Sequence, residues 1–139
     1  ALRQANASLQ ARFAPELNRR SGRILSALTG GRYQTLSLNR EFEASAQSGD
    51  SLLPRSSLSL SRGTADQIYL AVRLAVCQLC LPEASPSPLV LDDALLTFDD
   101  DRMALALDYL SGVGQQVLLF SCQKRESTRG LGNILCLQS

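Results

Sequence analysis

Two adjacent aspartates that follow a short apolar segment are the first candidates for chemistry in this chain. Residues 89–91 are continuously apolar, which predicts a buried strand covered on both faces, and Asp92 and Asp93 come directly after it. Ligands of open α/β sheets bind at the carboxyl ends of the strands, so these carboxylates can meet a metal ion. One side chain can then face Mg²⁺ and the other an attacking water. The alternative is an Asp-Asp helix cap or a surface turn.

A second candidate is the segment from Leu60 to Thr64 (Leu-Ser-Arg-Gly-Thr), because it opens a long apolar helix. Ser61 and Thr64 are good helix N-caps, and Gly63 lets the backbone come close to a ligand. The first N–H groups of a helix lack intrahelical partners and lie at the positive end of the dipole, so they bind anions readily. A plain capped helix explains the same residues without a ligand.

Two further segments end in polar residues that are candidates for the same site. Asp99 closes the sequence Leu-Leu-Thr-Phe-Asp, although it could equally cap the helix expected over residues 100–111. Gln123 follows the apolar strand expected over residues 116–121. Its amide can hydrogen-bond a phosphate oxygen but cannot take up charge near neutral pH. Residues 124–126 are interpreted as a solvated turn, with a phosphate contact as the alternative.

Taken together, these segments resemble the C-terminal ATPase lobe of bacterial SMC-like proteins, ABC-type ATP-binding proteins related to DNA-repair ATPases. The first matching motif is Thr-Gly-Gly-Arg-Tyr (29–33), and Leu-Ser-Arg-Gly-Thr and the Asp-Asp strand follow it. These last two match the signature loop, usually written L-S-G-G-[QE], and the Walker B strand. The resemblance extends from about Phe13 to the end of the chain.

The resemblance implies a role for each matching residue of the signature loop and the strand. It assigns Ser61 and Gly63 to the γ-phosphate of an ATP that the opposite protomer holds. Arg62 replaces the first glycine of the signature, and Thr64 stands at its final polar position. Asp92 is implied to hold Mg²⁺, mostly through water.

Three more positions follow from the same resemblance. Asp93 stands where the family usually has its catalytic glutamate, and its side chain is one methylene shorter. Asp99 matches the aspartate of the D-loop, which crosses the dimer interface. Gln123 stands at the position of the switch histidine, and the chain has no histidine.

No G-x-x-x-x-G-K-[ST] phosphate loop occurs in the sequence. The resemblance implies that an N-terminal lobe of the same protein supplies this loop, and that two heads hold ATP and Mg²⁺ between them. We therefore expect part of an ATP hydrolase of DNA repair or chromosome maintenance that is inactive by itself. The alternative is a non-catalytic α/β interaction module, or a degenerate ATPase half that dimerises or binds DNA. The departures at Arg62, Asp93 and Gln123 favour this alternative.

Length and composition limit the remaining classes. A chain of 139 residues with 45% hydrophobic and 19% charged residues fits one domain over residues 1–139. The apolar segments are too short to cross a bilayer and no secretory signal is visible, so we expect a cytoplasmic protein without a membrane partner. Residues 1–40 carry seven arginines against one glutamate. Arg12, Arg19 and Arg23 are therefore candidates for contacts with DNA phosphates, or they form a solvated helix face.

Cys77 and Cys80 form a Cys-x-x-Cys pair near the end of an apolar helical segment. A redox pair normally lies at an exposed helix N-terminus, and a zinc site needs further ligands. We interpret the two as buried structural thiols, which implies a reducing compartment, rather than as the centre of a thiol oxidoreductase.

The periodicity of the apolar residues predicts a helix over residues 1–28, the expected end of a coiled-coil arm, and an α/β lobe over 29–139. In the helix, Leu2, Leu9, Phe13, Leu17, Ile24 and Leu28 form one apolar stripe. Pro15 should kink it and force Ala14 out of helical geometry.

The α/β lobe should begin with an antiparallel hairpin and continue into a mostly parallel sheet with flanking helices. We expect a hairpin at 32–38 and 41–46, a loop at 47–57, a helix buried nearly all round at 64–81, a strand at 89–92, a helix at 100–111, and strands at 116–121 and Asn133–Leu137. The predicted fold is thus the C-terminal half of an ABC/SMC-type, P-loop-NTPase-like ATPase head.

Overall fold

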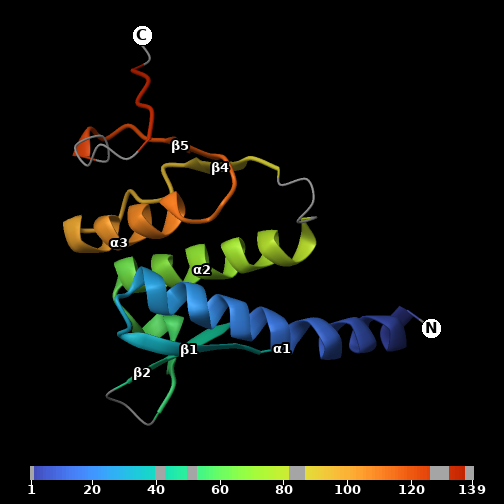
Figure 1. The fold of residues 1–139 in the computed structure, drawn as a ribbon. Coiled ribbons are helices and arrows are strands. Elements are labelled where there is room, and N and C mark those ends of the chain that lie inside the picture. Colours follow the sequence, from blue (N-terminus) through green and yellow to red (C-terminus); the bar gives the residue numbers. More distant parts are fainter. Residues whose placement is uncertain (1, 40–42, 50–52, 82–86, 126–131, 137–139) are drawn as a thin grey trace.

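The computed structural model describes residues 2–39, 43–49, 53–81, 87–125 and 132–136 (Figure 1). Side chains are described from Phe13 onward, with the exception of Leu58. Two predicted strand ends lie outside the described residues. They are Glu41, the expected first residue of the second strand, and Leu137, the expected last residue of the final strand.

Helix α1 (Leu2–Leu28) forms the N-terminal arm of the molecule and packs its second half into the core (Figure 1). Leu17, Ile24 and Leu28 are buried, as the apolar stripe predicts, whereas Phe13 is 46% exposed. The helix continues through Pro15, so the prediction that Ala14 leaves helical geometry is wrong. The preference against helix before proline is a bias only, and the long helical segments on both sides outweigh it.

The predicted hairpin is confirmed, with shifted ends. Strands β1 (Tyr33–Leu38), β2 (Ala44–Ser48) and β3 (Arg55–Ser56) form an antiparallel sheet in the order β1-β2-β3. Part of the expected loop at 47–57 is therefore strand, and the 3₁₀ helix η1 (Ser57–Ser59) follows it. The sheet lies against α1, where a Cβ on Gly22 would come within 3.4 Å of the Leu36 nitrogen.

Helix α2 (Arg62–Cys80) packs along α1 and begins two residues before the predicted Thr64. Its buried side chains include Ile68, Ala71 and Ala75. The expectation of a helix buried nearly all round is wrong, because Tyr69 is 49% exposed and Val76 is 40% exposed. One face of α2 thus lies at the surface.

A parallel pair of strands forms the second sheet. Strand β4 (Leu89–Asp92) pairs with β5 (Val117–Phe120), and helix α3 (Asp100–Ser111) connects them, as predicted. Residues 132–135 and Cys136 have no strand structure, so the last predicted strand is wrong over its described part. The core cluster contains buried side chains from α1, β1, β2, α2, β4 and α3.

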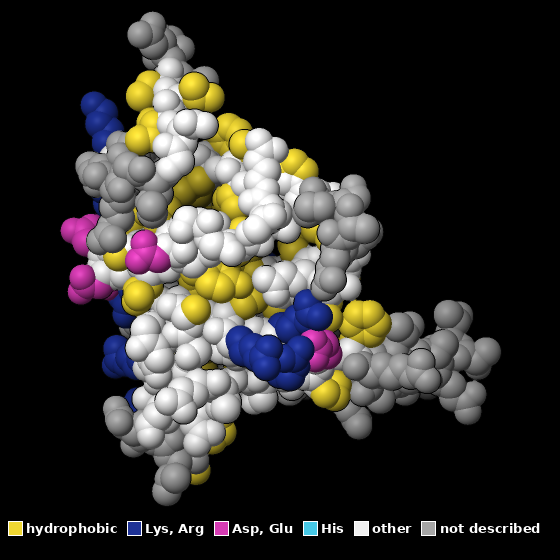
Figure 2. All heavy atoms as spheres, in the orientation of Figure 1, with side chains coloured by type: hydrophobic (Ala, Val, Ile, Leu, Met, Phe, Trp, Pro, Cys, Tyr) yellow, Lys and Arg dark blue, Asp and Glu magenta, His cyan; other side chains and the backbone are white. Residues whose placement is uncertain are grey.

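Only one face of the β4–β5 sheet is covered among the described residues, which corrects the prediction of a sheet buried on both faces. Leu89 is buried and Leu91 packs against the core, whereas Val90 is 59% exposed. Leu118 and Phe120 on β5 are also exposed. Figure 2 shows hydrophobic side chains at the surface in this part of the molecule. The alternation arises because the described helices supply packing partners on one side alone.

Candidate functional site

The two aspartates lie at the carboxyl edge of the parallel strands, as the sequence predicts. Asp92 ends β4 and is exposed. The Asp93 N–H donates to the Phe120 carbonyl (3.0 Å), and its Oδ1 accepts a hydrogen bond from the Cys122 N–H (3.1 Å). One carboxylate is therefore exposed at the strand end, while the other fixes the segment that follows β5.

Asp93 also has an unusual backbone. Its φ of +45° lies in the left-handed region, where aspartate is one of the few tolerated non-glycine residues. The Leu96 N–H then donates to the Asp93 carbonyl (3.1 Å), which turns the chain back toward α2. Surface-turn geometry, one of the alternatives for this pair, is thus observed at Asp93.

The first turn of α2 consists of the residues of the predicted signature segment. Ser61 is the N-cap residue by its backbone, but its hydroxyl pairs with the Thr64 hydroxyl (2.9 Å) instead of capping an N–H group. Ser61 and Arg62 are exposed, whereas Gly63 and Thr64 are buried. The first backbone N–H groups of the helix, which lack intrahelical partners, therefore belong to residues 62–64.

The loop that follows the two aspartates packs directly onto this turn. The Thr97 hydroxyl donates to an Asp66 carboxylate oxygen (2.5 Å). Phe98 and Leu95 are each 1% exposed and anchor the loop in the core. The strand-end loop and the signature segment, separate in sequence, are therefore neighbours in the structure.

Asp99 is the N-cap of α3. Its Oδ1 accepts a hydrogen bond from the Arg102 N–H (2.9 Å), and its Oδ2 pairs with the Arg102 guanidinium. The capping alternative for Asp99 is confirmed, while a D-loop role at a dimer interface stays a prediction.

Gln123 lies in a turn that is tied to the same region. Its Oε1 accepts from Arg125 Nε (2.6 Å), and Arg125 also reaches the Leu96 carbonyl (3.2 Å) and Asp100 (3.4 Å). The interpretation of 124–126 as a solvated turn is therefore wrong for Arg125, whereas Glu126 lies outside the described residues. The guanidinium thus has one acceptor in its own turn and two on the neighbouring loop and helix start, and sequence spacing does not reveal the last two.

A hollow of about 220 Å³ lies where three of the resembling segments meet. It is lined by residues of 29–33, of the first turns of α2 and of α3, including Arg32, Thr64, Asp101 and Leu105. The Arg32 guanidinium lies 5.8 Å from the centre of the Tyr33 ring. The segments at 29–33, 61–67 and 98–102 thus form one continuous region.

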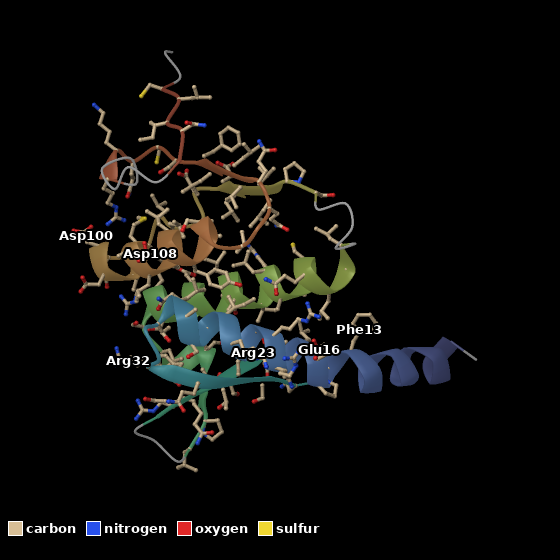
Figure 3. The ribbon with its side chains drawn as sticks, in the orientation of Figure 1. Phe13, Glu16, Arg23, Arg32, Asp100 and Asp108 are labelled. Atoms are coloured by element: carbon tan, nitrogen blue, oxygen red, sulfur yellow. The ribbon has the colours of Figure 1, made fainter. Side chains whose placement is uncertain are left out.

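Two arginines of α1 form ion pairs with a glutamate on the same helix. Glu16 accepts hydrogen bonds from Arg19 (2.7 Å) and Arg20 (2.6 Å), and these two guanidinium groups lower the pKa of its carboxyl to about 2. Arg23 is exposed on the same helix, as Figure 3 shows. The side chain of Arg12 lies outside the described residues.

The described residues also test the predictions for the cysteines and for metal-binding side chains. Cys80 is exposed and Cys77 is half-buried, so the interpretation as buried thiols is wrong for Cys80. The pair lies where α2 reaches the surface at its end. No group of three or more Cys, Asp or Glu side chains suited to a metal ion occurs in the described part of the chain. No helix among the described residues is long and apolar enough to cross a membrane.

Comparison with known proteins identifies the fold. No protein-family model matches the sequence. The uncharacterised protein YhaN of Bacillus subtilis is 31% identical over 113 residues, which cover 79% of this chain and 12% of that protein. The matched residues therefore span about an eighth of that protein's length.

Two solved structures are similar over most of the chain. One belongs to a study of ATP-driven dimerisation and DNA-stimulated activation of SMC ATPases, with a TM-score of 0.70 and 16% identity over 86% of this chain and 75% of that one. The other is the Smc head domain of Pyrococcus furiosus with an extended coiled coil, bound to the C-terminal domain of ScpA. Its TM-score is 0.65 with 16% identity over 90% of this chain and 32% of that one. The fold is that of the C-terminal region of an SMC ATPase head.

Proposed function

We propose that this chain is the C-terminal lobe of an SMC-like ATPase that acts in DNA repair or chromosome maintenance. An N-terminal lobe of the same protein supplies the phosphate loop, and two heads enclose ATP and Mg²⁺ between them. The observation that carries the proposal is the packing of the 95–98 loop, which follows Asp92 and Asp93, onto the first turn of α2. This contact joins the loop that follows the two aspartates to the first turns of α2 within an SMC-head fold.

The open face of the β4–β5 sheet supports an N-terminal lobe as the partner. Val90, Leu118 and Phe120 expose apolar surface there. Parallel sheets are normally packed on both faces, and the exposed apolar side chains of this face provide a surface on which a second layer of structure can pack. In the proposal the phosphate-loop lobe covers it.

The residues that would hold the cofactors fit their chemistry. Asp92 is an exposed carboxylate at a strand end. Mg²⁺ keeps several waters and is commonly held by one or two carboxylates together with substrate phosphates. Bound there, the ion supplies charge neutralisation to the phosphates. The N–H groups at the start of α2, beside Ser61 and Gly63, suit a phosphate of the ATP on the opposite head.

Asp93 supports a second candidate function, a degenerate half that dimerises without hydrolysis. One of its carboxylate oxygens already accepts the Cys122 N–H, so this side chain has a structural task at the strand end. A carboxylate held in this way is less available to accept a proton from water.

Substitutions in the assembled head, with the phosphate-loop lobe present, separate these candidates. Asp93→Asn should spare nucleotide binding and suppress turnover, because an amide cannot accept the proton of the water. Ser61→Arg should block ATP-driven dimerisation and leave nucleotide binding unchanged. Normal turnover in Asp93→Asn together with normal dimerisation in Ser61→Arg would refute the roles proposed for these two residues and leave both segments as structural caps. A wild-type head that dimerises without any turnover, together with loss of dimerisation in Ser61→Arg, would favour the degenerate half.

A further inference from the structure

Arg102 on α3 reaches from its own helix across to the first turn of α2. Its Nη2 donates to the Thr64 hydroxyl (3.4 Å) and its Nε to the Gln67 side-chain oxygen (3.2 Å). A third nitrogen, Nη1, pairs with the Asp99 carboxylate. The side chain is only 26% exposed, so these bonds are partly shielded from solvent.

Gly63 provides the room for this guanidinium. A Cβ at this position would lie 3.1 Å from Arg102 Nη1 and 3.4 Å from the Thr97 carbonyl oxygen. Glycine is disfavoured in helices relative to alanine, and this close contact accounts for a glycine at the second residue of α2. The arginine therefore packs against the helix start as well as bonding to it.

Gln67 extends the same set of contacts to α1. It is 2% exposed, and its Nε2 donates to the carbonyl of Leu28, the last residue of α1 (2.6 Å). Its oxygen is the acceptor for Arg102, so both ends of the amide have a partner. The carboxyl end of α1 is thereby linked through one buried amide to the guanidinium.

We propose that Arg102 is a positioning residue that holds the first turn of α2 and the loop at 95–99 in one fixed arrangement, with Gln67 connecting both to α1. A guanidinium suits this task because it presents five donors in a rigid planar fork, whereas an ammonium is a point charge. The inference rests on the proposed function in one respect: the two segments then form a single preorganised surface toward the second head.

Hydrogen exchange in this chain alone tests the positioning without any nucleotide. Arg102→Ala should accelerate amide exchange about tenfold at residues 65–67 of α2 and at Phe98 and Met103, whose N–H groups donate to backbone carbonyls, because charged hydrogen bonds to both segments are lost. The hairpin β1–β2 should exchange as in the wild type. Arg73→Ala, which removes an exposed arginine from α2, is the matched control and should change neither segment. Unchanged exchange in both segments of Arg102→Ala would overturn the inference.

Two further variants keep the test decisive if Arg102→Ala folds poorly. Arg102→Lys keeps the charge but presents its donors from a single nitrogen, whereas the three acceptors are bonded by three different nitrogens of the guanidinium. Faster exchange in both segments is therefore expected, and full protection would overturn the role of the guanidinium fork. In Gly63→Ala the new Cβ should displace the guanidinium and accelerate exchange at Phe98 and Met103. Wild-type exchange there would contradict the close contact.

Dimerisation of the assembled head then distinguishes this inference from the proposed function. Arg102→Ala should weaken ATP-driven dimerisation about tenfold at unchanged nucleotide affinity, and millimolar guanidinium should restore part of it. If Ser61→Arg blocks dimerisation while Arg102→Ala behaves like Arg73→Ala, the inference fails and the ATPase proposal stands. If Ser61→Arg dimerises normally, the role proposed for Ser61 fails, and exchange in the isolated chain still decides the positioning role.

Discussion

The Asp93 carboxylate accepts a hydrogen bond from the Cys122 N–H at 3.1 Å. This side-chain bond connects the segments that follow β4 and β5, past the last backbone pair of the two strands. Because Asp93 has a φ of +45°, the residue combines a strand-end bond with a left-handed turn. Few residue types satisfy both requirements, and aspartate and asparagine are among them.

Substitutions at Asp93 should therefore separate structure from chemistry. Asp93→Asn keeps an acceptor and tolerates the left-handed backbone, so the free energy of unfolding should change by less than about 0.5 kcal/mol. Asp93→Val removes the acceptor and strains the backbone, which should cost about 2–3 kcal/mol. Urea denaturation of this chain measures both. Equal stability of the valine and asparagine variants would contradict the role of the strand-end bond.

Nucleotide binding by the isolated chain should be weak. We expect no ATPase activity above background and no ATP affinity tighter than the high-micromolar range, about −5 kcal/mol, because the sequence has no phosphate loop. Isothermal titration calorimetry with and without Mg²⁺ measures this. Tight, magnesium-dependent binding would show that the proposed division between two lobes is wrong.

The sequence predicted the order of the elements because their apolar periodicities are strong. The hairpin, α2, β4, α3 and β5 were all found near their expected positions. Errors arose where tertiary context decides: Pro15 stays within a helix, and the β4–β5 sheet has a face that the described residues leave open. A run of apolar residues predicts a buried strand but does not say which chain buries it.

The candidate site was predicted in its location but not in its internal contacts. The adjacent aspartates and the helix start were visible as local patterns. Arg102 was missed, because its partners Thr64 and Gln67 are 38 and 35 residues away in the sequence. The only sequence signals were a glycine within the first turn of a helix and a glutamine among apolar helix positions, and both have local explanations.

The metal position can be tested at Asp92 in the assembled head. Asp92→Asn should weaken binding of magnesium-nucleotide, because it removes a charge next to the metal. Asp93→Glu, whose side chain is one methylene longer, should leave turnover intact or raise it if reach limits this site. Nucleotide affinity is compared with Mg²⁺ and with EDTA. An Asp92→Asn head whose magnesium-dependent affinity equals that of the wild type would remove Asp92 from the metal site.

The ion pairs of Glu16 predict a dependence of stability on pH. Hydrogen bonds from Arg19 and Arg20 lower the pKa of Glu16 from 4.5 to about 2 in the folded chain. The charged form is therefore favoured by folding, so its stabilisation is present above pH 4.5 and is lost as the pH falls toward 2. NMR titration of the carboxyl carbon measures the pKa, and Glu16→Gln should remove this component of the acid transition. Because the pair is exposed, high salt should raise the pKa.

The same glutamate bears on the arginines proposed to contact DNA. Arg19 is held by Glu16 at 2.7 Å, whereas Arg23 is exposed on the same helix (Figure 3). If these arginines and Arg12 contact DNA phosphates in the assembled protein, affinity should fall with salt by about 0.9 log unit per contact per log unit of salt. Replacing all three by alanine should flatten this slope.

The Glu16→Gln variant provides the complementary measurement. Removal of the carboxylate releases Arg19 and Arg20 from their ion pairs. Affinity for duplex DNA should then rise and the salt slope should steepen, because more positive charge becomes available to the phosphates. Fluorescence anisotropy of a labelled duplex across a salt series measures both. An unchanged salt slope in the triple alanine variant and in Glu16→Gln would identify the arginines as a solvated face of α1. In that case, neither removing the arginines nor breaking their ion pairs would change the affinity for the duplex.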